Sequence, residues 1–565
     1  MKRFITYSLM AILMVFGKNL IANNVVVTNV TLTNQNTSAG VNNAANHTFI
    51  RFNITWDNSW RVTTGPNNWD AVWVFAKYQT FGGNYAHATL STTSAHHTVT
   101  TTNGVSVTIQ PSADGKGVFM YRSSPGTGSI NWQDVLLRWN YRTDGVDDNA
   151  SVTMQVFAVE MVFIPQGSFY LGDGNINTTP SANAFRRNNQ PLTTAQGREA
   201  YLVTSENAIT TLSGTSTLLN SLYDPAFSNS MTGNAGYTIP ANYPKGFNAF
   251  YTMKYEVSQK QYADFFNTLP TAPIADPQKG ARNITQPQAS AARNNFNWSG
   301  ANLDDVALNR FGTAGSGDRA QNFLSWQDAI AYADWAALRP MSEFEFEKAA
   351  RGNDVTYGPI YPINGEYAWG NTSINSWSGG NALNDNTISE GLVSPSTNQT
   401  NANYGTITIN SGTVSGNTQG PVRCGIFAAK NITTNQRRQA GASFYGVMEM
   451  SGNVAEMVVA PIALNTSTCY SPLLNYISAL SRTVHGDGVI PSGSSDITTW
   501  QISNSGVWPV VKGGSWSDAV GNLATSIRYG GYTYNNCSTT LSASNNPVGT
   551  TRSNNVGFRP VRTAP

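Results

Sequence analysis

The sequence predicts an α+β protein in which an all-β N-terminal domain precedes a larger domain that mixes helices and strands. Three observations support this prediction. Residues 24–158 contain seven short runs in which apolar and polar residues alternate, which is the period of a half-buried strand. Helix patterns with N-terminal caps begin only beyond residue 250. The chain has 565 residues, which is too long for one compact core.

The N-terminal runs are separated by clusters of Asn, Gly, Asp and Thr, which favour turns, and this pattern predicts a β-sandwich of the immunoglobulin-like kind over residues 23–158. The expected strands are Val25–Leu32, Phe49–Trp56, Ala71–Lys77, Val105–Ile109, Gly117–Tyr121, Val135–Tyr141 and Val152–Val159. Four tryptophans crowd this domain: Trp56, Trp60, Trp69 and Trp73. We interpret them as core residues, with an aromatic binding surface as the alternative.

Residues 1–22 have the features of a secretory signal peptide. Lys2 and Arg3 precede the apolar run Tyr7–Phe16, and Ala22 supplies a small residue at the expected cleavage point. The run is too short to cross a membrane, and a buried N-terminal strand or helix is the alternative. We therefore expect a protein that is secreted or held at the cell surface, without a membrane span.

Charge and metal-ligating residues limit the classes of function. Only 12% of residues are charged. The whole sequence has 34 basic and 32 acidic residues, and without residues 1–22 it has 31 basic and 32 acidic residues, so its net charge stays close to zero. Nucleic-acid binding through phosphate neutralisation is therefore not expected. We expect exposed or structural roles for the N-terminal histidines, because adjacent residues on a strand face opposite sides and do not converge on a metal. These histidines are His47, His87, His96 and His97.

The second domain is expected to contain three capped helices. Phe250–Val257 is strand-like, and Ser258 then begins a helix with Gln261 three residues later, which is a capping box. The other two helices are expected over Ser325–Leu338 and Ser342–Gly352. Glu343 and Glu347 share one face of the last helix and resemble an acid/base pair. We expect a salt bridge from Glu347 to Arg351 instead, because the two are four residues apart.

Several blocks beyond residue 159 resemble the formylglycine-generating-enzyme, or sulfatase-modifying-factor, domain, a variant of the C-type-lectin-like fold. The matching blocks are Met161–Gly174, Glu256–Phe265, Trp326–Trp335, Arg339–Gly352, Tyr367–Asn371, Gly446–Met457, Val511–Trp516 and Asn555–Arg562. The resemblance implies that residues 159–565 form this domain. Three insertions rich in Asn, Thr, Ser, Ala and Gly interrupt it, at about 175–240, 270–317 and 377–420.

The catalytic positions of the resemblance are altered. Active members of the family bind copper(I) through two cysteines that follow a G-G-S motif at fixed offsets, and this chain has Asp518 and Leu523 there. A related branch holds iron through three histidines, and beyond residue 160 this chain has only His485. A Ser-His-Asp arrangement around His485 is disfavoured, because serines are too abundant for proximity to carry meaning. We therefore expect copper to be absent and the protein to be non-enzymatic.

The resemblance also implies a structural calcium ion, which is the one cofactor we expect. Its implied ligands are Asn453 and Glu456, and three residues of separation brings two oxygen ligands to one turn. A capped turn without metal is the alternative. The cysteines Cys424, Cys469 and Cys537 allow one disulfide and one free thiol, and the sequence does not choose among the three pairings.

Three functions remain as hypotheses. The first is an extracellular structural or binding protein whose partner is a protein or glycan at the cell surface, or copies of itself, because the N-terminal strands offer pairing edges. The second is a copper oxidase or other metalloenzyme that assembles a thiolate pair from its three cysteines. The third is a calcium-dependent glycan-binding module.

Overall fold

The computed structural model describes most of the chain outside the insertions. The described residues are 25–173, 185–186, 200–210, 219–220, 238–269, 291–294, 296–298, 311–313, 317–352, 367–370, 373–376, 399–405, 419–429, 436–464, 475–502, 507, 509–527 and 552–565. The expected signal peptide and most of the three expected insertions lie outside these ranges.

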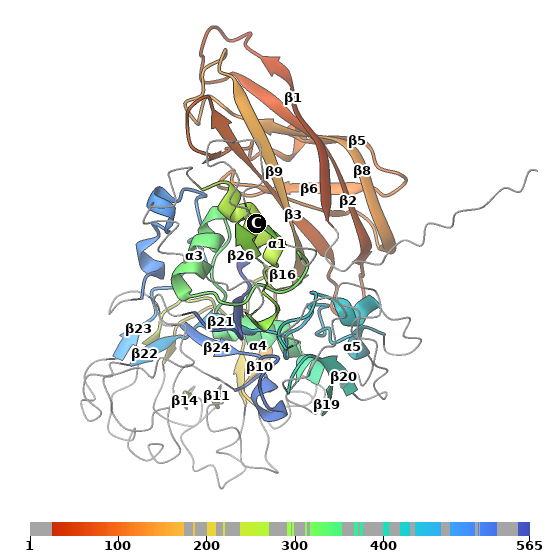
Figure 1. The fold of residues 1–565 in the computed structure, drawn as a ribbon, viewed down its shortest axis with the longest axis vertical. Helices are drawn as coiled ribbons and strands as arrows, with labels where there is room; N and C mark the ends of the chain where they lie inside the picture. Colours follow the sequence, from red (N-terminus) through yellow and green to blue (C-terminus); the bar gives the residue numbers. More distant parts are fainter. Residues whose placement is uncertain are drawn as a thin grey trace, which may run out of the picture.

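Two sheets pack face to face in the N-terminal part (Figure 1). The first is antiparallel, with strand order β1 (Val26–Asn36), β2 (His47–Arg61), β8 (Gly126–Trp139) and β5 (Thr98–Thr101). The second has the order β26 (Val561–Thr563), β16 (Phe250–Met253), β9 (Val152–Ile164), β3 (Asp70–Thr80), β7 (Val118–Arg122) and β6 (Val107–Pro111), and β4 (Ala86–His87) pairs with β3. Alternating side chains of both sheets bury the core between them, including Trp56 and Trp132.

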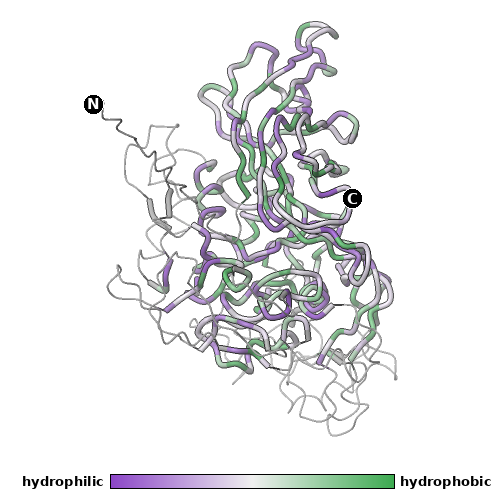
Figure 2. Tube along the Cα trace, turned by 90° about the vertical axis from the view of Figure 1, so that its right-hand side faces the viewer, coloured by the Kyte–Doolittle hydropathy of each residue, from purple (hydrophilic) through white to green (hydrophobic). Residues whose placement is uncertain are grey.

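Strand β9 joins this part to the rest of the molecule. Its residues 152–162 pair with β3, and its residues 161–164 pair with β16, so one sheet runs through both parts. The domain boundary expected between residues 158 and 159 lies inside this strand. The last strand, β26, pairs with β16, and Figures 1 and 2 place the C-terminus at the junction of the two parts.

Helices α1 (Gln259–Asn267) and α3 (Trp326–Trp335) pack on the outer face of the shared sheet. Helix α4 (Glu343–Arg351) packs against Val162 and Ile164 on the opposite face, and the short α5 (Gln436–Gln439) contacts residues 399–402. Trp73 of β3 donates its indole N–H to the carbonyl of Ala336 at 2.8 Å, directly after α3. Aromatic side chains of the sheet, such as Phe75, meet Trp335 in one hydrophobic cluster. Figure 2 shows hydrophobic segments (green) running through the interior of both parts.

The expected capping boxes are confirmed. Ser258 accepts from the backbone N–H of Gln261, and Ser342 accepts from that of Glu345. The helix expected over Ser325–Leu338 is shorter, and Asp328 completes a third capping box with Ser325. Gly352 ends α4 with φ +100°, where an added Cβ would lie 2.8 Å from Cβ of Phe444.

A three-stranded sheet forms the centre of the C-terminal part, with order β24 (Pro509–Lys512), β21 (Ala455–Val459) and β25 (Val556–Phe558). Short two-stranded ladders surround it: β10 (Phe169–Leu171) with β12 (Tyr201–Val203), β11 (Phe185–Arg186) with β14 (Leu219–Asn220), β13 (Ile209–Thr210) with β15 (Thr238–Ile239), β17 (Phe296–Trp298) with β18 (Phe311–Thr313), β19 (Ser373–Ser376) with β20 (Gln399–Ala402), and β22 (Ile462–Leu464) with β23 (Asn475–Ile477).

All seven N-terminal strands expected from alternation are present, with ends displaced by several residues, and β4 and β5 were not expected. The expected aromatic core is also found, since Trp56, Trp60 and Trp73 are buried and Trp69 is partly buried. The histidine ring of His97 contacts the backbone carbonyl of Ser91 at 2.8 Å, which is a structural role.

Candidate functional site

The two central sequence motifs lie side by side. Strands β21 and β24 pair antiparallel, so Glu456 is opposite Lys512. The turn after β24 contains Gly513 and Gly514, whose φ angles of 84° and 63° favour glycine. The carbonyl of Gly513 accepts from the N–H of Gly452 at 2.8 Å. The fold therefore brings the altered catalytic positions next to the predicted calcium ligands.

The positions of the two family cysteines are occupied by a hydrogen-bonded carboxylate and an apolar side chain. Asp518 is buried, and its Oδ2 accepts from Ser515 Oγ at 2.5 Å. Leu523 is fully buried in a small hydrophobic cluster with Ile374 and Ala402. These two positions offer one hard oxygen ligand and no sulfur, which does not fit copper(I).

Cys424 is a buried thiol beside an acidic group. Its Sγ donates to the carbonyl of Glu256 at 3.7 Å and lies 4.0 Å from Glu256 Oε2. Burial and the charge of Glu256 raise the pKa of Cys424, so the neutral thiol is favoured over the thiolate that a metal requires. The other two cysteines lie outside the described residues, so the pairing expected from the sequence stays open.

Asn453, the first predicted calcium ligand, already has protein partners for both ends of its amide. It occupies a left-handed backbone conformation with φ 69° at the turn before β21. Its Oδ1 accepts from the N–H of Val422 at 2.8 Å, and its Nδ2 donates to Glu256 Oε2 at 2.6 Å. The amide thus ties three separate segments together.

Glu456, the second predicted ligand, is paired with Arg559. Both carboxylate oxygens accept from the Nε of Arg559 at 3.0 Å, and Oε1 also accepts from its Nη2 at 2.6 Å. Arg559 also donates to the carbonyls of Met253, Lys254 and Met448 at 2.7–3.1 Å. A calcium ion at Glu456 would have to displace this guanidinium, and calcium at this position stays a prediction.

Two further carboxylates complete this buried network, and sequence reasoning gave neither a site role. Glu256 accepts from Asn453 and from the N–H of Val454 at 3.1 Å. One oxygen of Glu449 accepts from the N–H of Gly425 at 2.7 Å, and the other has no hydrogen-bond partner among the residues that the structure describes. Burial raises the pKa of Glu449 to about 8, while Arg559 opposes the shift. Glu256 and Arg559 both stand in family blocks, but only the fold brings them near enough to interact electrostatically.

The carboxylates of α4 are structural, as the sequence predicted. Glu347 forms an ion pair with Arg351 four residues later, and its Oε1 accepts from Lys512 Nζ at 2.8 Å. Burial alone would raise the pKa of Glu347, but Lys512 and Arg351 outweigh it and lower the value. Glu343 lies 3.9 Å from the same ammonium. A carboxylate held in this way is a poor proton acceptor, so an acid/base pair is not supported here.

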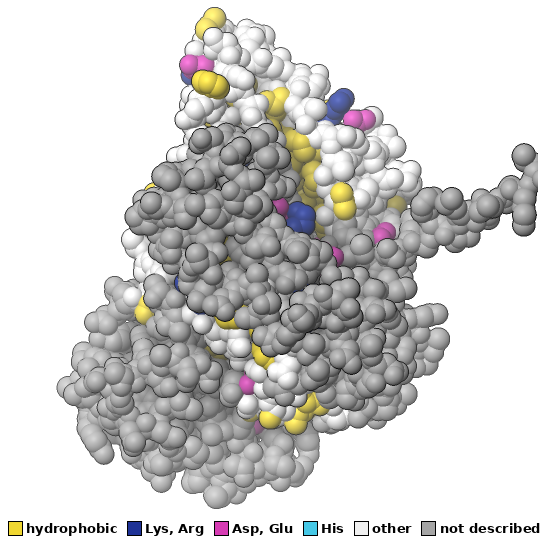
Figure 3. All heavy atoms as spheres, in the orientation of Figure 1, with side chains coloured by type: hydrophobic (Ala, Val, Ile, Leu, Met, Phe, Trp, Pro, Cys, Tyr) yellow, Lys and Arg dark blue, Asp and Glu magenta, His cyan; other side chains and the backbone are white. Residues whose placement is uncertain are grey.

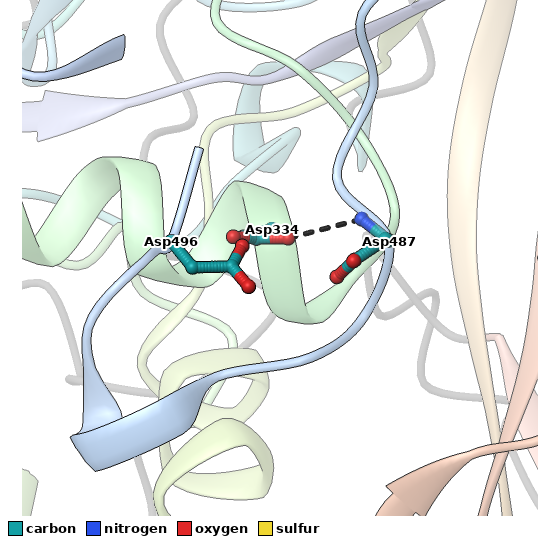
Figure 4. A group of neighbouring side chains, drawn as sticks. All are labelled: Asp334, Asp487 and Asp496. Atoms are coloured by element: carbon teal, nitrogen blue, oxygen red, sulfur yellow. Dashed lines mark hydrogen bonds between the residues drawn. The ribbon is translucent and has the colours of Figure 1, made fainter. Parts of the chain in front are cut away.

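A separate group of three carboxylates lies at the end of α3 (Figure 4). Oxygens of Asp334, Asp487 and Asp496 all lie within 4.8 Å of one another. Asp334 Oδ1 accepts from the N–H of Asp487 at 3.0 Å, and its Oδ2 accepts from Ser495 Oγ at 2.6 Å. Burial raises the pKa of Asp334 to about 7, and the neighbouring Asp487 and Asp496 act in the same direction. Hard cations prefer such oxygen ligands.

His485 is a buried acceptor. Its Nε2 accepts from the backbone N–H of Thr563 at 3.1 Å. Burial and the nearby Arg562 and Arg339 lower its pKa, so the imidazole is neutral. This contact holds β26 against the loop that contains His485, and it gives the ring a structural role.

The sequence matches a family model described as the sulfatase-modifying factor enzyme 1-like domain over residues 149–564. Among solved structures, Treponema denticola variable protein 1 matches with 13% sequence identity and a TM-score of 0.27, covering 72% of this chain and 96% of that one. No curated protein matches significantly. Within the described residues, no helix is long and apolar enough to cross a membrane.

Proposed function

From the premise that this chain belongs to the family of sulfatase-modifying factor enzyme 1-like domains, we propose that it is a non-enzymatic binding or structural protein built on that scaffold. The observation that carries the proposal is Leu523. Its side chain is fully buried among apolar neighbours at the position where the family places a copper-binding cysteine. Asp518, the other altered position, is engaged by Ser515.

We place this protein outside the cell, either secreted or at the cell surface. The support is the sequence of residues 1–22, which resembles a signal peptide, together with the weakly charged composition. Its partners in this proposal are proteins or glycans at the surface, or further copies of the chain in a filament or layer. Enrichment of the cleaved chain in the extracellular fraction is the expected result.

Copper(I) titration of the full mature chain tests the proposal. We expect no stoichiometric binding by wild type, because the two family positions contribute no thiolate. The matched positive control is the double variant Asp518→Cys with Leu523→Cys, which restores both cysteines at the family spacing. Tight copper(I) binding by wild type that is lost when Cys424, Cys469 or Cys537 is exchanged for serine would overturn the proposal and favour the oxidase.

Calcium remains part of the proposal as a structural cofactor at Asn453 and Glu456, and a calcium-dependent glycan-binding module is the corresponding alternative function. Because Arg559 occupies both oxygens of Glu456, binding there requires the guanidinium to move. Calorimetric titration of wild type and Glu456→Gln with calcium tests this role. Loss of binding in the variant would support it, and equal binding would exclude Glu456 as a ligand.

A further inference from the structure

The outer edge of β9 is open over half of its length. β3 pairs with residues Val152–Val162, whereas β16 covers only Met161–Ile164. The position beside β9 is occupied by β16 only as far as Lys254, whose N–H donates to the carbonyl of Glu160 at 2.9 Å. Beyond Lys254 the chain turns away from β9 and forms α1. From residue 152 to 159, the outer edge of β9 has no backbone partner among the described residues.

Antiparallel geometry identifies the open groups. In an antiparallel ladder, the N–H and C=O of one residue point to the strand on one side, and those of the next residue point to the strand on the other side. The N–H of Phe163 donates to Trp69, on the β3 side, while the carbonyl of Glu160 faces the β16 side. The register has no irregularity, so the even-numbered residues Met154, Val156 and Ala158 direct their N–H and C=O groups to the open edge.

A cleft of about 380 Å³ borders this open edge. Its walls are the start of β1, residues 25–30, and residues 154–159 of β9, together with side chains of α1 and α3. Figure 3 shows apolar side chains (yellow) exposed on this face of the N-terminal part. Among the described residues that line the cleft, the charged ones are Lys260 and Asp264, which neutralise each other in an ion pair of 2.7 Å. The lining therefore suits an uncharged occupant.

Tyr332 gives a second, independent indication of a ligand. It lines the cleft from α3, it is 1% exposed, and its hydroxyl has no hydrogen-bond partner in the described structure. A buried hydroxyl without a partner is costly, and such a group is normally satisfied. The hydroxyl is shielded from water in the empty cleft, so it would have to turn toward an occupant in order to donate to that occupant's carbonyl oxygen.

We propose that this cleft binds an extended, uncharged segment of a partner polypeptide, which adds to the sheet as a strand beside β9. The segment would occupy the position beside β9 that β16 no longer fills beyond Lys254. The open edge from Val152 to Ala158 has room for about seven residues, or about 23 Å at about 3.3 Å per residue. Backbone hydrogen bonds would supply affinity, and alternating side chains would supply specificity. This inference rests on the proposed binding function and assigns it a surface.

Peptide binding to the full mature chain tests the inference. The probe is a seven-residue peptide that alternates valine and threonine with blocked termini, and its control carries a central proline. We expect saturable binding of the first peptide alone, with slower hydrogen exchange at the amides of Met154, Val156 and Ala158. In the free chain these amides should exchange faster than those of Phe157 and Val159, which face β3.

Two variants separate this role from folding. Val156→Pro removes an N–H that points to the open edge and leaves every hydrogen bond to β3 in place. It should therefore leave the chain folded and lower the affinity for the probe peptide about tenfold. Tyr332→Phe removes the hydroxyl that has no partner in the described structure, so it should raise the melting temperature of the free chain. It should still lower the affinity for the probe peptide. Tyr78→Phe is the matched control, because the hydroxyl of Tyr78 already donates to the backbone carbonyl of Asp144 at 3.2 Å. It should lower the melting temperature and leave probe binding unchanged.

Five results would overturn the inference. Four of them are no binding of the probe, equal binding to Val156→Pro, protection of the three amides in the free monomer, and protection that appears only as copies of the chain associate. The last result would assign the cleft to a second copy. A simple amphiphile such as decanoate that competes fully without protecting the amides would likewise contradict a strand. The copper(I) titration concerns residues 513–523, so either proposal can fail alone.

Discussion

Replacement of Arg559 by methionine is the most direct test of the buried network. Arg559 is fully buried and holds Glu456 together with three backbone carbonyls that come from two separate segments. Removal of one partner from a buried ion pair costs about 3–5 kcal/mol, because the other charge stays buried without compensation. The three carbonyls add to this loss wherever water does not replace the guanidinium. We expect Arg559→Met to lower the free energy of unfolding by about 3–6 kcal/mol.

The assay is equilibrium denaturation in urea, monitored by tryptophan fluorescence at pH 5 and pH 8. The loss should be smaller at pH 5, because the carboxylates around Arg559 then take up protons and the unpaired charge disappears. The double variant Arg559→Met with Glu456→Met should recover part of the loss. Arg51→Met is the matched control, since its pair with Asp134 at 3.7 Å is about half exposed and should contribute less than about 1 kcal/mol. A loss below about 1 kcal/mol for Arg559→Met, or strict additivity in the double variant, would refute the reasoning.

Two further predictions concern pH. Burial raises the pKa of Glu449 from its ordinary value of 4.5 to about 8, so the folded chain binds more protons than the unfolded chain between these values and its stability falls as pH rises through this window. Glu449→Gln should reduce that fall in pH-dependent denaturation, and an unchanged slope would contradict the assignment. The pKa of Asp334 is raised from 3.8 to about 7, with the same sign, so stability is lost as pH rises from about 4 to about 7. Asp334→Asn should flatten this region, whereas Asp496→Asn, at the exposed member of the group, should change it less.

Local features of the sequence were sufficient for the seven N-terminal strands and for three of the helices. Alternation placed the seven N-terminal strands, because one buried and one exposed face impose a period of two on any strand. Ser258, Ser325 and Ser342 marked three helix starts, because a cap satisfies backbone groups within one turn and needs no distant partner. The i, i+4 spacing likewise predicted the pair between Glu347 and Arg351, which the fold confirms.

The family blocks also placed the central motifs correctly, but the roles of individual side chains depended on distant contacts. Asn453 and Glu456 do lie together, yet their oxygens meet Val422 and Arg559, which are remote in sequence. Glu256 joins the same network from almost 200 residues away. Spacing along the chain contains no information about such partners, because they converge only when β21, β24 and β25 pair.

The sequence by itself determined that this chain is a β-rich domain followed by a sulfatase-modifying-factor domain whose copper positions hold Asp518 and Leu523. Only the tertiary structure decided that β9 runs through both parts and that Arg559 binds Glu456. It also decided that half of one strand edge has no partner strand within the described ranges, beside Tyr332. The physical reason is the distance along the chain over which each effect acts. Periodicity, caps and motif residues act over a few positions, whereas burial, ion pairing and strand neighbours are set by segments that are distant in the chain and close in space.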